Sequence, residues 1–273
     1  SIIKHADKSL PFNLDEKFSL LAKPPYGLYG NYAAMGMVAF ALRPWVNKIF
    51  DTQGKPRDAK ALVDDISMLF KVWDENKSNS KLTFKFQTPE EGKLCKELIN
   101  LFNLSGKDSA YKDVSSLKDA RYAITGDFLV RKGAPLWSIK YAPKSAFASL
   151  PAEIPITDEI KTLVDDIVTI CADRDLRNPA LVNETLKLLE AWRIDLKNIL
   201  NINVVFQEGF NSFLMQIDRI ELKPEEIEDV KTYVKGHLES TVGYWTEEEI
   251  TNAAKNWRLE QQYPAYTPGT PSG

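Results

Sequence analysis

Apolar residues recur at steps of three and four positions over most of the chain, which is the period of amphipathic α-helices. A single stretch, 82–86, alternates apolar and polar residues as a half-buried strand does. The apolar segment 136–141 lies between glycine and proline residues and fits either a short strand or an extended loop. The predicted helices cover 58–73, 89–102, 114–130, 157–174, 179–199, 204–217, 224–239 and 246–262. The pattern therefore predicts a mainly α protein with helical domains and a small β element in the first half.

One helix has no polar face. Residues 32–42 (YAAMGMVAFAL) are apolar throughout and follow Asn31, which is a good helix N-cap. Eleven residues are too few to cross a membrane, which takes about 20, so this segment is predicted to be a buried helix. Pro44 should kink or restart this helix, which is expected to reach Phe50, and a turn should follow over 51–57.

The order of elements from Tyr32 to Leu104 also contains the parts of a small winged-helix-like module. That arrangement needs a second strand beside 82–86, and the sequence indicates none. It remains an alternative within the mainly α class.

Charge divides the chain into two halves. Residues 1–150 hold 23 basic and 16 acidic side chains, whereas residues 151–273 hold 12 and 22. Pro151 and Pro155 lie where the sign changes. We therefore expect a basic, mostly helical domain with a short strand or hairpin over 1–150 and an acidic helical bundle over 151–262. A flexible tail is predicted over 263–273, where prolines replace the apolar period.

The composition is that of a globular protein, and few catalytic chemistries fit the sequence. Of 273 residues, 44% are hydrophobic and 27% are charged. Two cysteines and two histidines stand far apart, without the spacing of a zinc site or a catalytic pair. Phosphate-binding loops and nucleophile elbows are not found either. We therefore predict no catalytic residue, no metal and no cofactor in this chain.

Two segments are candidates for contact with a partner. The loop before the apolar helix combines prolines, glycines and tyrosines, and its candidate residues are Lys23, Pro25, Tyr26, Gly27, Tyr29 and Asn31. The second set interleaves cations with an aromatic ring, a combination that suits phosphate contact and base stacking. Its candidate residues are Lys81, Lys85, Arg131, Lys132, Trp137, Lys140 and Lys144. Packing of a helix entry and an ordinary strand edge are the structural alternatives for these two segments.

Two short motifs carry a family resemblance. Pro25, Tyr26 and Gly27 precede a helix, and Pro135, Leu136 and Trp137 follow later in the chain. Here the chain resembles accessory regions of large bacterial phage-defence ATPases of the BREX type. The resemblance implies an accessory region outside the ATPase core, with the nucleotide site elsewhere in a longer polypeptide.

The absence of an initial methionine and of a signal-like segment led us to expect a cytoplasmic fragment of a larger protein. Its predicted function is non-catalytic protein interaction within a multi-component bacterial assembly. The alternative is a nucleic-acid-binding module that uses the basic half. A membrane partner is not expected, since no segment is long and apolar enough to span one.

Overall fold

The computed structural model describes residues 11–27, 31–75, 82–105, 114–148, 156–172 and 178–262. The chain divides into two compact units. Unit 1 comprises Ser1–Arg121 with Asp173–Leu186, and unit 2 comprises Tyr122–Ala172 with Lys187–Gly273. This division differs from the boundary predicted near residue 150. Pro151, Pro155 and the predicted tail over 263–273 lie outside the described residues.

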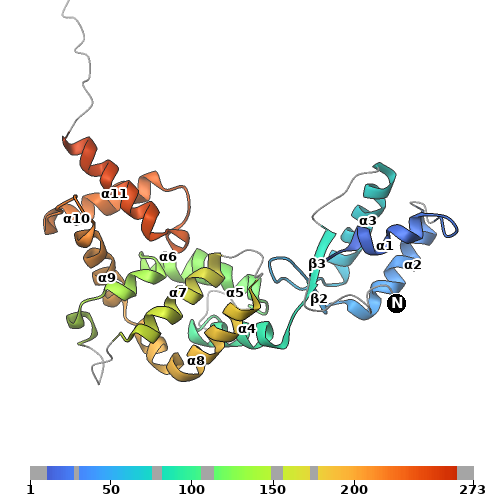
Figure 1. Ribbon diagram of the computed structural model, residues 1–273, viewed down its shortest axis with the longest axis horizontal. Helices are drawn as coiled ribbons and strands as arrows, with labels where there is room; N and C mark the ends of the chain where they lie inside the picture. The colour runs from blue at the N-terminus through green and yellow to red at the C-terminus, as the bar shows by residue number, and fades with distance from the viewer. Residues whose placement is uncertain are drawn as a thin grey trace, which may run out of the picture. The chain divides into compact units, whose positions relative to one another are not determined.

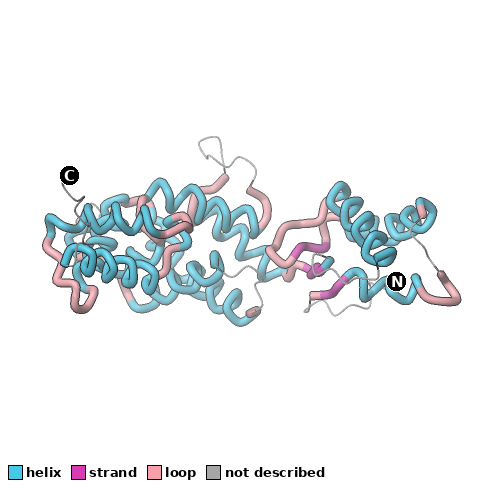
Figure 2. The backbone as a smooth tube through the Cα atoms, turned by 90° about the horizontal axis from the view of Figure 1, so that it is seen from above, coloured by secondary structure: helices cyan, strands magenta, loops and turns pink. Residues whose placement is uncertain are grey.

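Helices form most of both units, and the strands of the described residues belong to unit 1 (Figure 2), so the predicted mainly α class is confirmed. The elements that begin in the first segment of unit 1, before residue 122, are β1 (Phe12–Asn13), α1 (Leu14–Ala22), α2 (Tyr32–Leu42), η1 (Arg43–Trp45), β2 (Ile49–Asp51), α3 (Ala59–Glu75), β3 (Thr83–Phe86), α4 (Pro89–Leu101) and α5 (Leu117–Ala123).

The sheet of unit 1 is antiparallel, with the strand order β1-β3-β2. Phe12 is paired with Phe84 on one side of β3, and Ile49 is paired with Phe86 on the other. These four side chains join one buried cluster with apolar residues of α1, α2 and α3. The three helices lie beside the sheet (Figure 1). The rings of Trp45 and Phe86 meet edge to face at 5.3 Å. The sheet therefore organises the core against which α2 packs.

The strand predicted at 82–86 is confirmed as β3, but the sequence did not predict the two strands that pair with it. Residues 12–22 form β1 and α1. The helix expected to reach Phe50 ends earlier, so that Ile49–Asp51 becomes β2. Both partner strands precede β3 in the chain. A single strand, not a hairpin, follows α3 within the described residues, and the winged-helix-like arrangement stays a prediction.

The secondary-structure elements in the described part of unit 2 are all helices or helical turns. Its elements are η3, a π-helical turn (Ile124–Phe128), α6 (Leu129–Lys132), η4 (Leu136–Tyr141), η5 (Lys144–Phe147), α7 (Asp158–Ala172), α8 (Pro179–Leu200), which begins in unit 1, α9 (Asn203–Gln216), η6 (Pro224–Glu226), α10 (Ile227–His237), η7 (Val242–Tyr244) and α11 (Glu247–Gln262). Residues 136–141 are thus neither strand nor extended loop: they form a buried 3₁₀ turn packed against α9.

Two glycines allow backbones in unit 2 to approach closely. A Cβ atom at Gly209 of α9 would lie 2.1 Å from the carbonyl oxygen of Ser138 in η4. A Cβ at Gly243 of η7 would lie 2.2 Å from the carbonyl oxygen of Thr125 in the π-helical turn. Both neighbours are backbone atoms, so no side-chain rotation relieves either contact. These crossings therefore require glycine.

Candidate interaction surface

The candidate surface is the outward side of α2 together with the turn before it. Asn31 caps α2, its side chain accepting a hydrogen bond from the backbone N–H of Ala34 at 2.8 Å, as the sequence predicted. The preceding turn is closed by the N–H groups of Tyr26 and Gly27, which both donate to the carbonyl oxygen of Lys23 at 3.0 Å. Gly27 has φ of +53°, the conformation expected of a glycine there. Both the turn over 23–27 and the start of α2 at Asn31 are therefore fixed by local hydrogen bonds.

Most of the predicted loop residues are exposed on this turn. Lys23, Pro25 and Tyr26 face solvent, and 67% of Tyr26 is accessible. Tyr29 lies outside the described residues. The turn over 23–27 therefore exposes an aromatic ring, that of Tyr26.

The prediction that α2 is a buried helix is wrong for half of its surface. Ala34, Val38 and Leu42, spaced four residues apart, pack into the core. The opposite side is open: the exposed fractions are 94% for Tyr32, 62% for Met37 and 76% for Phe40. Since α2 has no charged residue, this open side is apolar. A helix that is apolar all round is normally covered on every side, and contiguous exposed apolar patches mark interaction sites.

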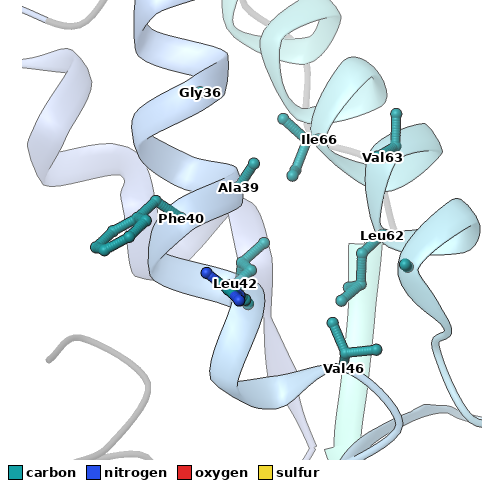
Figure 3. Close-up of a pocket in the computed structure, with 10 residues that line it drawn as sticks. Gly36, Ala39, Phe40, Leu42, Val46, Leu62, Val63 and Ile66 are labelled. Atoms are coloured by element: carbon teal, nitrogen blue, oxygen red, sulfur yellow. The ribbon is translucent and has the colours of Figure 1, made fainter.

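An apolar groove runs between α2 and α3 and has a volume of about 390 Å³. In Figure 3, Ala39, Val46, Leu62 and Ile66 point toward one another across it, whereas Phe40 extends from the side of α2 away from α3. The remaining lining residues are Gly36, Leu42, Arg43, Ala59 and Val63. The groove has room for a side chain of a partner. Phe40 projects from α2 and could enter a pocket on a partner.

The residues predicted to contact nucleic acid are distributed differently. Lys85 is buried in the sheet of unit 1, where its Nζ lies 2.9 Å from a carboxylate oxygen of Glu91. Trp137 is buried in unit 2 and donates its indole N–H to the carbonyl oxygen of Trp245 at 2.7 Å. Both side chains therefore have structural roles, and the Trp137 ring is not available to stack on a base.

Lys140 and Lys132 are also engaged within unit 2. The Lys140 ammonium lies 2.7 Å from Asp165 and 2.8 Å from Glu247. Partial burial alone would lower the pKa of Lys140, but these two carboxylates raise it above its usual value. Lys132 donates to the side-chain oxygen of Asn203 at 2.6 Å, and burial, with a smaller contribution from neighbouring Arg131, lowers its pKa.

The other three cations of this set differ from one another. Arg131 is exposed and forms an ion pair with Asp127, one helical turn earlier. Lys144 is exposed at the start of η5. Lys81 lies outside the described residues. The structure therefore does not bring the predicted set together as one accessible cationic surface.

Within the described ranges, no group of three or more His, Cys, Asp or Glu side chains gathers at one point where it could hold a metal ion. No helix of those ranges is long and apolar enough to span a bilayer. Both cysteines are buried, and neither forms a disulfide bond. Burial raises the pKa of the Cys95 thiol to about 11, so this thiol is a poor nucleophile at neutral pH.

Comparisons with known proteins give no relative for this chain: no family model, no curated protein and no solved structure matches it. The exposed side of α2 was missed by sequence reasoning because an all-apolar helix carries no periodic signal that tells its open side from its packed side. The tyrosines and prolines of the preceding turn were the available signal at this surface.

Proposed function

We propose that this chain is a non-catalytic accessory region of a larger bacterial protein and that it binds a protein partner within a multi-component assembly. The observation that supports the proposal is the open apolar side of α2. Met37 and Phe40 are exposed, and contact between their apolar surfaces and water is unfavourable in free energy. A partner that covers them removes this unfavourable contact.

The proposal extends to the class of the parent protein. The exposed turn that carries Pro25 and Tyr26 is one of the two motifs that resemble accessory regions of phage-defence ATPases of the BREX type. The other motif, Pro135 to Trp137, is buried in unit 2, where it serves packing. On this proposal the ATPase site belongs to another part of the polypeptide, and the assembly is cytoplasmic.

Nucleic-acid binding is the less favoured function. Phosphate contact requires cations that are free to exchange their counterions, and Lys85 and Lys140 are held by carboxylates instead. Trp137 does not offer a stacking surface. Arg131 and Lys144 are the accessible remainder of the described set.

Photo-crosslinking at α2 tests the proposed function. A benzoylphenylalanine residue replaces Phe40 in the full chain, and the matched control carries it at Ile194, a residue of α8 that is 69% exposed. Each protein is irradiated in extract of the source cell, and cross-linked peptides are identified by mass spectrometry. We expect one recurrent protein partner at position 40 that is absent at position 194. Equal labelling at both positions, or labelling at neither, contradicts the proposal.

A further inference from the structure

The chain that forms the α2 side of the groove is cationic, whereas α3 on the other side carries the exposed Asp64 next to the lining residue Val63. From Lys17 to Phe50 the sequence has four basic residues and no acidic one. One of the four, Arg43, lines the groove itself. Its side chain is exposed and has no ion-pair partner among the residues that the structure describes. An apolar groove with an unpaired guanidinium at its edge selects for a partner that has an apolar face and a carboxylate next to it.

The shape of the groove favours a helix. Two helices, α2 and α3, form its walls, and its lining is apolar except for Arg43. Amphipathic helices bind such grooves by inserting side chains spaced three and four residues apart. A flat bilayer surface would contact projecting residues such as Phe40, but it would not fill the hollow near Leu62 and Ile66.

We propose that the groove between α2 and α3 binds an amphipathic helix of a partner protein and that an acidic residue of this helix pairs with Arg43. The proposal rests on the proposed function and specifies the chemistry of its partner. A glutamate beside the apolar stripe of the helix would form a bidentate ion pair with the guanidinium. The apolar side chains would pack against Ala39, Val46 and Leu62.

Charge argues against the N-terminal segment as the occupant. Residues 1–10 contain Lys4 and Lys8 but only one acid, Asp7. This segment does not supply the net negative charge that would complement Arg43.

Two synthetic peptides of 18 residues test the proposal. Both are fluorescent amphipathic helices with identical leucines at positions i, i+3, i+4 and i+7. One has glutamates beside the leucine stripe and the other has lysines. Binding to the full 273-residue chain is measured by fluorescence anisotropy. We expect the glutamate peptide to bind about tenfold more tightly, because only its charge complements Arg43.

Two variants locate the effect. Arg43→Glu should reverse the preference so that the lysine peptide binds more tightly. Val63→Glu places a charge on an exposed lining residue and should abolish binding of both peptides, whereas Ile194→Glu in α8 should leave binding unchanged. All three sites are exposed, and circular dichroism checks that each variant is folded.

Several outcomes would overturn the acidic helix as the occupant. Equal affinity for both peptides, or a preference that Arg43→Glu does not change, contradicts the pairing. Binding to phosphatidylserine vesicles that Val63→Glu abolishes assigns the surface to a membrane. A dimer in sedimentation that Val63→Glu dissociates assigns it to a second copy. A tenfold gain in peptide affinity on deletion of residues 1–10 assigns it to the N-terminal segment.

The two proposals fail separately. If cross-linking at position 40 identifies a protein partner but the peptides show no charge preference, the proposed function stands and the acidic helix is wrong. If cross-linking identifies no partner and neither peptide binds, both proposals are wrong.

Discussion

Replacement of Gly209 by alanine is predicted to destabilise unit 2 because α9 touches the backbone of η4 at this residue. The added Cβ would lie 2.1 Å from the carbonyl oxygen of Ser138 and 2.8 Å from its carbonyl carbon. A contact without overlap needs at least about 3 Å, so the two backbones must separate by about 1 Å. Overpacking of a core costs about 1–3 kcal/mol, and this exceeds the gain of about 1 kcal/mol that alanine brings to a helix interior.

We expect Gly209→Ala to lower the free energy of unfolding by about 2 kcal/mol. Urea unfolding followed by tryptophan fluorescence measures it, since Trp137 lies in the same core and packs against Phe210 and Phe213. The matched control is Gly236→Ala in α10, where an added Cβ meets no atom within 4 Å. This control should be unchanged or more stable by up to about 1 kcal/mol. A Gly209→Ala protein that unfolds at the same urea concentration as the parent chain, or a higher one, refutes the close contact.

Three further predictions follow from buried or paired groups. Gly243→Ala should destabilise unit 2 by about 1–3 kcal/mol in the same urea assay, because its Cβ would lie 2.2 Å from a backbone oxygen. Lys85→Met should cost about 3 kcal/mol, since it leaves Glu91 buried without its cation, and the double variant with Glu91→Gln should recover part of this loss. The pKa of Glu226 is lowered to about 2 by hydrogen bonds from Arg258 and from the backbone of Lys223, so its share of stability is present above pH 4.5 and is lost as the pH falls toward 2; NMR titration should find the low pKa, and Arg258→Ala should raise it.

Each of these predictions has an opposing outcome. Unchanged stability of Gly243→Ala would mean that η7 does not approach the π-helical turn closely. Additive costs in the Lys85 and Glu91 double-mutant cycle would mean that the two side chains do not interact. A Glu226 pKa near 4.5 in the parent chain would contradict the ion pair with Arg258.

Local signals in the sequence predicted the helices well. The cap predicted at Asn31 is confirmed by a hydrogen bond from the backbone N–H of Ala34, and Thr88 and Asn178 accept hydrogen bonds of the same kind at the starts of α4 and α8. These bonds join residues two or three positions apart, so a short window of sequence contains all the information. The same holds for the turn over 51–57, which is closed by bonds to the side chain of Asp51.

Contacts between distant residues account for what the sequence did not predict. Strands β1 and β2 have two and three residues, too few to show a period, and each exists because it pairs with β3. Lys140 was a candidate phosphate contact until the fold placed it beside Asp165 and Glu247, which lie far from it in the chain. The open side of α2 depends on which neighbours pack against it, and its uniform apolar sequence does not record this.

The central claim is that the contact surface of this protein is the apolar side of α2 and not the set of cations predicted to bind nucleic acid. DNA binding by the full chain at about 50 and 200 mM salt is the measurement that tests it. Fluorescence anisotropy with mixed-sequence single- and double-stranded DNA is sufficient. We expect the chain to show no salt-sensitive DNA binding, because Lys85 and Lys140 are already paired with carboxylates. Salt-sensitive binding that is lost on neutralisation of Arg131, Lys132, Lys140 and Lys144 would contradict it and assign the protein to nucleic acid.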